Sequence, residues 1–507
     1  MAARLLKSTL VTGGMTSVSR VFGLVRDIVL AVSFGAGLDA FLVAFRMPNL
    51  LRRLFAEGAF VQSFAPVLGE YRERRGRDEI RALLDQVSAV LGGGLSLLAV
   101  LGVAAAPLLV ALFAPGFLGT PQFPEAVAML RLTLPYLPLI SLVALAGAVL
   151  NVYGRFAAPA FAPVLLNLSL IGCALWLSPL LARPVHALAW GVLLAGVLQF
   201  LFLLPFLRRL GLLPRPALRR DPQGARRIFR LMGPALFSAS VFQLNGIVDM
   251  LLASFLTAGS ISWLYYADRL MEFPLGVFGI ALGTVLLPSL AAHHARRDTG
   301  AHIRLLDRGL RWALLIGVPA ALGLVVLAEP IGITIFQYER FSAEDARRTA
   351  AALAAYSLGL PAMILAKILA AGYHSRQDTA TPARIGLFVV IANLLLNLLL
   401  IGPLGHVGLA LATALAATLN AGLLYRGLRR LAVFAPRPGW GRFLLRVALA
   451  CLAMVLLLQW QAVPGDVWLQ WPAWRRAAAL AGVVAAGAAA YGAAFALLGG
   501  RPPRLEA

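Results

Sequence analysis

The chain has 507 residues, of which 60% are hydrophobic and only 13% are charged. This apolar fraction exceeds the roughly 45 to 50% of soluble domains, and the apolar runs have the length of membrane-spanning helices. The composition therefore excludes a soluble enzyme, a secreted disulfide scaffold and an outer-membrane β-barrel, and it predicts an all-α polytopic membrane protein. The net charge of +23 would suggest nucleic-acid binding on a soluble surface, but the arginines lie mostly between apolar segments, as in cytoplasmic loops.

Fourteen membrane-spanning helices are expected from the lengths of the apolar segments. They cover residues 10–34, 39–68, 83–114, 126–153, 159–182, 184–207, 229–257, 263–292, 309–337, 346–373, 383–402, 405–427, 441–462 and 473–499. Several connections after even-numbered segments are rich in arginine, for example 208–230 and 296–311, whereas those after odd-numbered segments carry almost no basic residues. The positive-inside rule therefore predicts that both termini are cytoplasmic.

The chain contains an internal repeat. The sequence LLNLSLIG at 165–172 returns as LLNLLLIG at 395–402, IRALLD at 80–85 returns as IRLLD at 303–307, and LRRL at 207–210 returns at 428–431. Three collinear matches indicate a duplicated unit of six helices. Because six is an even number, both copies have the same orientation in the membrane, which is an architecture of transporters.

The repeat divides the chain into four predicted parts. They are an N-terminal six-helix lobe at 1–210, a basic cytoplasmic linker at 211–228, a C-terminal six-helix lobe at 229–433 and two accessory helices at 434–507. The accessory helices lie outside the duplication, and tryptophans near their ends are typical of anchors at the membrane interface.

Charged residues are concentrated in the first, second and eighth predicted segments. The predicted site residues among them are Arg20, Arg26, Asp27, Asp39, Arg52, Arg53, Glu57, Asp268, Arg269 and Glu272, and the second segment also carries Arg46. A charge at the centre of a bilayer costs about 2.5 to 3.5 kcal/mol on insertion scales, so these segments are expected to line a hydrated cleft.

Arginine dominates this set of charges. A guanidinium group binds phosphate oxygens through two parallel hydrogen bonds and stays charged at any relevant pH, so the expected cargo is anionic and phosphorylated. The carboxylates would then orient the arginines or form gates that open during transport. The alternative is that the ion pairs only lock the helices together.

A second polar group is expected around Asp249 in the seventh segment, with Asn393 and Asn397 in the eleventh and Thr413 in the twelfth. The two asparagines are four residues apart and therefore share one helical face. Oxygen ligands of this kind suit a monovalent cation, and hydrogen bonding between helices is the alternative. Asn167 is the repeat counterpart of Asn397, which favours a partly structural role for these amides.

Several motifs point to one family. They are SRVFGLVRD at 19–27, FGAG at 34–37, PNLLRRLFAEGAF at 48–60, YYADRLMEFP at 265–274, and SRQD at 375–378 followed by Thr381-Pro382. With these motifs the chain resembles the MurJ (MviN) lipid II flippases. The resemblance covers essentially the whole chain, including the two accessory helices.

The resemblance implies a fold of the multidrug/oligosaccharidyl-lipid/polysaccharide exporter (MOP) type, with two six-helix lobes around a cationic cavity in the bacterial cytoplasmic membrane. The implied cargo is lipid II, the undecaprenyl-diphosphate-linked disaccharide-pentapeptide used in peptidoglycan synthesis. In the family, the positions of Arg20, Arg26, Arg52 and Arg269 serve the diphosphate and its gating, with Asp27, Asp39 and Glu57 as charged partners. The accessory helices would hold the polyprenyl tail, and Asp249, Asn393, Asn397 and Thr413 fall where some members bind sodium.

The expected mechanism is alternating access that moves lipid II from the inner to the outer leaflet. The sequence has no phosphate-binding loop for ATP, so the membrane potential, a cation gradient or both would drive transport, and no enzymatic activity is expected. Alternatives are export of another lipid-linked oligosaccharide or amphiphile, a polyprenyl-phosphate transferase, and a scaffold for cell-wall synthesis. The expected partners are lipid II and membrane lipids, with the cell-wall synthesis machinery as an open candidate.

Overall fold

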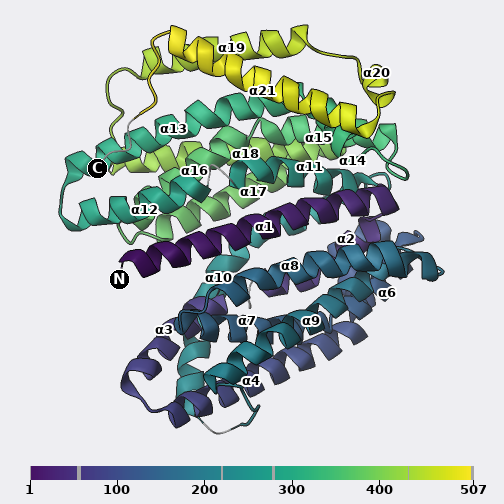
Figure 1. The fold of residues 1–507 in the computed structure, drawn as a ribbon, viewed down its shortest axis with the longest axis vertical. Coiled ribbons are helices and arrows are strands. Elements are labelled where there is room, and N and C mark those ends of the chain that lie inside the picture. Colours follow the sequence, from purple (N-terminus) through teal and green to yellow (C-terminus); the bar gives the residue numbers. More distant parts are fainter. Residues whose placement is uncertain (1, 54–58, 219–220, 277–279, 432, 504–507) are drawn as a thin grey trace. The chain divides into compact units, whose positions relative to one another are not determined.

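The computed structural model describes residues 2–53, 59–218, 221–276, 280–431 and 433–503 (Figure 1). All regular secondary structure in these ranges is helical, which confirms the predicted all-α class. The chain divides into two compact units, Met1–Gly259 and Ser260–Ala507.

The first unit contains ten α-helices and three short helical turns among its described residues. They are α1 (Ala2–Phe34), α2 (Asp39–Leu51), α3 (Ala59–Arg74), α4 (Arg77–Ala104), α5 (Ala106–Phe113), η2 (Pro115–Phe117), α6 (Gln122–Thr133), α7 (Tyr136–Val152), α8 (Ala157–Gly172), η3 (Cys173–Leu177), η4 (Ser178–Leu180), α9 (His186–Leu210) and α10 (Pro222–Ala253). Helix α8 packs between α1 and α9, and α7 packs on α4 and α9. Small residues such as Ala146 and Gly147 on α7 allow this close helix packing.

The second unit contains eleven α-helices in the part of the chain that the structure describes. They are α11 (Ser260–Pro274), α12 (Ile280–Ala295), α13 (Thr299–Val326), α14 (Ala328–Phe336), α15 (Ala343–Ser357), α16 (Leu360–His374), α17 (Ala380–Leu404), α18 (His406–Arg430), α19 (Trp440–Trp460), α20 (Gly465–Leu469) and α21 (Ala473–Leu497). Helices α19 and α21 form a pair that lies along α13 (Figure 1). Phe443 and Val447 of α19, Leu315 of α13 and Phe495 of α21 are buried together in this contact.

Nine helical segments of the described residues are long and apolar enough to cross a membrane, or ten when the bent pair α15 and α16 counts as one span. The chain is therefore a multi-pass membrane protein, while the number of fourteen spans stays a prediction. The predicted spans that fall short are the first, second, seventh and eighth, on α1, α2–α3, α10 and α11–α12. Helix α1 carries Arg20, Arg26 and Asp27, and α2, α3, α11 and α12 are each shorter than a membrane-spanning helix.

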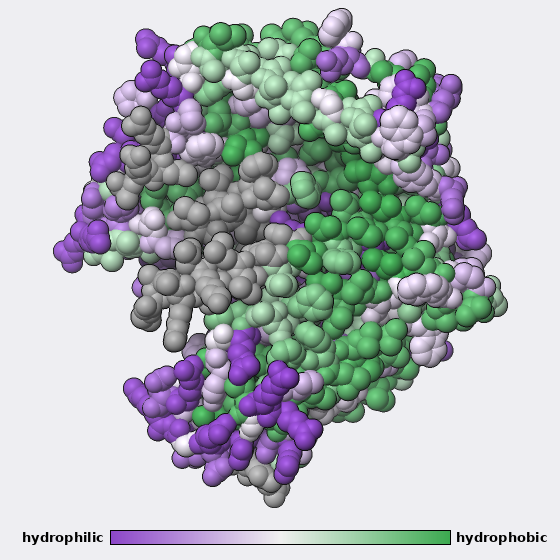
Figure 2. All heavy atoms as spheres, in the orientation of Figure 1, coloured by the Kyte–Doolittle hydropathy of each residue, from purple (hydrophilic) through white to green (hydrophobic). Residues whose placement is uncertain are grey.

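The surface of the second unit shows how its helices meet lipid. Hydrophilic side chains gather toward the ends of the helices, and hydrophobic side chains cover the middle (Figure 2). On α17 the side chains of Leu387, Phe388, Ile391, Leu395 and Leu399 are exposed. Exposed apolar residues in this number on one helix are expected where the surrounding solvent is hydrocarbon.

The division between the units differs from the predicted lobe boundary. By its packing, α10 belongs to the first unit, since it contacts α3 and α4. The side chain of Asp221 accepts a hydrogen bond from the backbone N–H of Gly224 and so caps this helix. The prediction followed the start of the duplicated sequence at residue 229, whereas the packing places the first helix of the second copy in the first unit.

Candidate functional site

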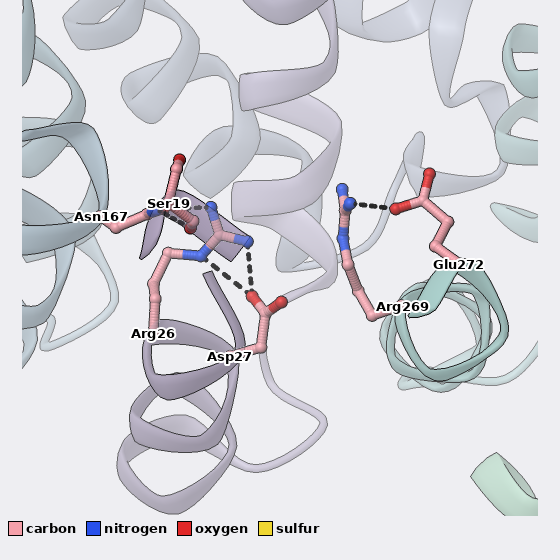
Figure 3. Close-up of polar contacts among 6 residues, drawn as sticks. All are labelled: Ser19, Arg26, Asp27, Asn167, Arg269 and Glu272. Carbon is pink, nitrogen blue, oxygen red and sulfur yellow. Dashed lines mark hydrogen bonds and ion pairs between the residues drawn. The ribbon is translucent and has the colours of Figure 1, made fainter. Parts of the chain in front are cut away.

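Arg26 is the central cation of the predicted site in the first unit. Its Nε and Nη2 atoms donate to Oδ1 of Asp27 at 2.9 and 2.6 Å, and its Nη1 atom donates to Oδ1 of Asn167 at 3.0 Å (Figure 3). The side chains are 12% exposed for Arg26 and 3% for Asp27. Removal of this pair from solvent strengthens its electrostatic attraction and holds the guanidinium group in one orientation.

Asn167 is the residue that the sequence predictions did not place in this site. Its side chain lies on α8, and its Nδ2 atom donates to the backbone carbonyl oxygen of Ser19 on α1 at 3.2 Å (Figure 3). The amide therefore joins α8 to α1 and orients Arg26 at the same time. The available signal was its position in the repeated LLNLSLIG sequence, which favoured a partly structural role.

The other predicted arginines of the first unit occupy different surroundings. Arg20 is exposed on α1, whereas Arg52 and Arg53 are half-buried directly after α2. The Nε and Nη2 atoms of Arg52 donate to Oδ1 of Asn49 at 3.2 and 2.7 Å, a contact within one helical turn. Glu57 lies outside the described residues.

Arg46 on α2 is a second residue that the predicted site omitted. A β-carbon added to Gly246 of α10 would overlap with Nη2 of Arg46, so the guanidinium group lies directly against the backbone of α10. Only glycine permits this approach. Arg46 thus packs beside Gly246, three residues before Asp249 on α10. The sequence shows the charge of Arg46 in an apolar segment but not this contact, because glycine has no side chain to signal it.

Asp39 stabilises a turn within the first unit. It is buried, it is the first residue of α2, and its Oδ2 atom accepts a hydrogen bond from the backbone N–H of Gly259 at 2.6 Å. Gly259 has a positive φ of 96°, which favours glycine. The carboxylate therefore fixes the turn that follows α10.

The predicted site residues of the second unit lie on α11. This helix buries one face, where Tyr266 packs on Phe336 and Phe341 with ring centroids 4.7 and 5.3 Å apart. The other face carries Arg269, whose Nη1 atom donates to Oε2 of Glu272 at 2.6 Å (Figure 3). The two side chains are 30% and 46% exposed, so this charged face remains open to solvent.

Neighbouring residues support the orientation of Arg269. Its guanidinium carbon lies 5.0 Å from the ring centroid of Tyr265, one turn earlier on α11. A guanidinium group above an aromatic ring gains a cation–π attraction that survives partial exposure to water. Asp268 is half-buried on the same helix. The charged face of α11 thus presents an oriented arginine, as the anionic-cargo hypothesis requires.

The residues predicted for a cation are distributed over both units. Asp249 is half-buried on α10, while Asn393 and Asn397 are buried on α17 and Thr413 is half-buried on α18. Nδ2 of Asn397 donates to Oδ1 of Asn393 at 3.1 Å, and the hydroxyl of Thr413 donates to the carbonyl oxygen of Leu409 at 3.1 Å. The described residues contain no group of three or more His, Cys, Asp or Glu side chains suited to a metal. The hydrogen bonds fit the structural alternative, and cation binding stays a prediction.

Comparison with known proteins identifies the family. Residues 30–469 match the family model described as lipid II flippase MurJ. The chain belongs to the MurJ lipid II flippase family. It is 44% identical to the probable lipid II flippase MurJ of Vibrio cholerae over 100% of this chain and 98% of that protein. It is 45% identical to the lipid II flippase MurJ of Burkholderia cenocepacia, with 91% of each chain covered.

Solved structures of transporters share the fold. A structure of lipid II flippase MurJ in an inward closed conformation superposes with a TM-score of 0.80 at 26% identity, covering 96% of this chain and 98% of that one. An inward-facing multidrug resistance MATE family transporter of the MOP superfamily gives a TM-score of 0.70 at 15% identity, covering 84% and 98%. The predicted family and the predicted MOP-type fold are both confirmed.

Proposed function

We propose that this MurJ family member flips lipid II from the inner to the outer leaflet of the bacterial cytoplasmic membrane by alternating access. The observation that carries the proposal is the oriented arginine in each unit: Arg26, held by Asp27 and Asn167, and Arg269 on the open face of α11. Both lie in a chain of the MurJ family. A diphosphate offers the oxygen pairs that guanidinium groups bind best.

The contact between Arg26 and Asp27 supplies a mechanism for release. An incoming diphosphate would compete with the Asp27 carboxylate for the N–H groups of Arg26, and departure of the diphosphate would restore the pair. Since Arg26 and Asp27 are largely withdrawn from water, an unpaired charge there is costly, and each state needs a partner for the arginine. Such an exchange would couple cargo binding to a change in the site.

The membrane potential would set the direction of lipid II transport. A diphosphate headgroup carries two negative charges, and outward movement in a cell that is negative inside is favoured by about 2.3 kcal/mol per charge for each 100 mV. A cation at Asp249 could help to reset the empty carrier. The empty protein would then return to the inward-facing state without cargo.

The proposed orientation places both termini in the cytoplasm. In the first unit, Arg77 and Arg81 donate to backbone carbonyl oxygens at the end of α9, so two basic connections meet at one end. In the second unit, the indole N–H of Trp312 donates to the carbonyl oxygen of Pro503 at 2.8 Å, which brings the C-terminal segment to the middle of α13. Arg311, the residue before Trp312, donates to the carbonyl oxygen of Pro438 in the basic connection after α18. A C-terminal reporter active only in the cytoplasm tests this orientation.

The function is tested by substitution of the two arginines in a strain that depends on this chain for growth. Arg26→Ala and Arg269→Ala should each abolish growth and the appearance of lipid II on the outer face, while protein abundance stays normal. Arg74→Ala is the matched control, because Arg74 is exposed near the end of α3. Normal lipid II externalisation by both Arg26→Ala and Arg269→Ala would refute the proposal.

A further inference from the structure

Two buried aspartates occupy the same place in the two units. Asp85 is the ninth residue of α4 and Asp307 is the ninth residue of α13, and both helices have 28 residues. The aspartates stand at the end of the repeated IRALLD and IRLLD sequences. Both are withdrawn from solvent, with exposed fractions of 6% and 3%. A buried carboxylate is costly unless its oxygens accept hydrogen bonds, so its partners reveal its role.

In the first unit, the partner of Asp85 is the connection that follows α9. Oδ1 of Asp85 accepts a hydrogen bond from the backbone N–H of Arg215 at 2.6 Å. The backbone carbonyl oxygen of Asp85 accepts another from the N–H of Ala217 at 3.2 Å. Arg215 lies between Pro214 and Pro216, which have no N–H. Asp85 therefore accepts from the only backbone donor of this Pro-Arg-Pro sequence.

In the second unit, the connection after α18 repeats this arrangement. It contains Pro436, Arg437 and Pro438, and the backbone N–H of Arg437 donates to Oδ1 of Asp307 at 3.3 Å. Arg215 and Arg437 are separated by the same 222 positions as Asp85 and Asp307. The arrangement of a buried aspartate and a Pro-Arg-Pro sequence has thus been duplicated with the six-helix unit.

Asp307 has two further partners. Its Oδ1 atom accepts from the indole N–H of Trp440 at 2.7 Å, and its Oδ2 atom accepts from Nε of Arg311 at 2.9 Å. Nη2 of Arg311 also donates to the carbonyl oxygen of Pro438 at 3.2 Å. Trp440 is the first residue of α19, so in this unit the carboxylate holds both the connection and the helix after it.

In the first unit, the connection leads to α10 through a second anchored aspartate. Asp221 accepts from the hydroxyl of Tyr71 on α3 at 2.7 Å and caps α10 at the N–H of Gly224. Burial and this hydrogen bond to the carboxylate raise the pKa of Tyr71 to about 12, so the hydroxyl remains a donor at physiological pH. The start of α10 is thereby tied to α3 and α4.

We propose that Asp85 and Asp307 are positioning residues of one duplicated latch, which captures the lone N–H of each Pro-Arg-Pro connection and so fixes where α10 and α19 begin. Helix α10 carries Asp249 and contacts Arg46, and α19 belongs to the accessory pair predicted to hold the lipid tail. The effect of the latch on transport rests on the proposed function, whereas the capture of the N–H does not.

Hydrogen exchange tests the capture directly. In the purified full-length protein, Asp85→Ala should accelerate exchange of the Arg215 amide by about 10- to 100-fold, the effect expected for loss of a hydrogen bond to a charged group. Asp85→Asn keeps an oxygen acceptor and should retain most of the protection. Unchanged exchange of this amide in Asp85→Ala would refute the latch, whatever the cargo is.

Backbone substitutions provide a matched pair for the transport measurement. Arg215→Pro removes the N–H, and Arg215→Ala removes the exposed side chain but keeps the N–H. We expect Arg215→Pro to lower lipid II turnover without lowering lipid II affinity, and Arg215→Ala to behave as the wild type. The double variant Asp85→Ala/Arg215→Pro should lose no more lipid II turnover than either single variant, because both substitutions remove the same hydrogen bond.

Three results would overturn this assignment. They are equal loss in Arg215→Ala and Arg215→Pro, additive loss in the double variant, or no rescue by Asp85→Asn. In the second unit, Trp440→Phe should weaken the attachment of α19 to Asp307 more than Arg437→Pro does. The hydrogen bond from the Trp440 indole to Oδ1 of Asp307 is 2.7 Å long, whereas the one from the Arg437 N–H is 3.3 Å long. Normal lipid II externalisation in Arg26→Ala and Arg269→Ala would instead refute the proposed function and leave the exchange result standing.

Discussion

Replacement of Asn167 separates the orientation of Arg26 from its charge. In the wild type, Oδ1 of Asn167 accepts from Arg26 at 3.0 Å and Nδ2 donates to the carbonyl oxygen of Ser19 at 3.2 Å. Asn167→Ala removes both hydrogen bonds and keeps the ion pair between Arg26 and Asp27. The positive charge of the site is unchanged, so a loss of transport would be due to a changed orientation of Arg26.

The magnitude follows from the kind of bond that is lost. A hydrogen bond to a charged group contributes about 1.5 to 3 kcal/mol, and each 1.36 kcal/mol corresponds to a tenfold change in rate. If the transition state of transport uses the oriented arginine, Asn167→Ala should lower lipid II turnover by about 10- to 100-fold. Asn167→Asp should also lower turnover, because a second carboxylate beside Arg26 would compete with the diphosphate.

The assay is lipid II transport into the outer leaflet of proteoliposomes, normalised to the amount of folded protein. Asn151→Ala is the matched control, since it makes the same chemical change at an exposed asparagine at the end of α7. Asn167→Ala that transports as well as Asn151→Ala would refute the positioning role. Full activity of Asn167→Asp would refute the competition between carboxylate and diphosphate.

Two further predictions concern the cation and the pH dependence of stability. Replacement of sodium by choline should slow turnover of the wild type, and Asp249→Asn should remove this dependence; a wild type indifferent to sodium would contradict the predicted cation. The backbone N–H of Thr381 donates to Asp378 at 3.0 Å and lowers the pKa of this carboxyl group. Its stabilisation is thus present above the ordinary pKa and lost as the pH falls through the lowered value. Thermal unfolding of Asp378→Asn should therefore depend less on pH between about 5 and 3, and an unchanged pH dependence would contradict this.

Sequence periodicity and composition predicted the helical class and the position of most helices, because apolar segments of this length have few other stable forms in a membrane. They did not predict where the helices within a span are interrupted. The fourth expected span is divided into α6 and α7 next to Pro135, and the ninth into α13 and α14 at Leu327. A break of one or two residues leaves the average hydrophobicity unchanged, so it produces no signal in composition.

The candidate site could be predicted only as far as charge is visible in the sequence. Charges in apolar segments identified Arg26, Asp27 and Arg269, whose ion pairs are formed with residues one or three positions away along the chain. The hydrogen bond that Asp39 accepts from the backbone N–H of Gly259, 220 residues away, was not predictable. Every residue except proline offers such a donor, and only the folded chain selects one.

The two copies of the repeat differ at the position of Arg26. Asp249 follows Asp27 by 222 residues, and Asn397 is the repeat counterpart of Asn167, so the second copy keeps the carboxylate and the amide. The residue before Asp249 is Val248, where the first copy has Arg26. In the first copy the arginine satisfies both polar groups with one positive charge. At the repeat position of this arginine the second copy has an apolar side chain, so the two copies differ in the groups beside the carboxylate. The predicted cation concerns the second copy alone, and sodium removal and Asp249→Asn are therefore expected to have the same effect.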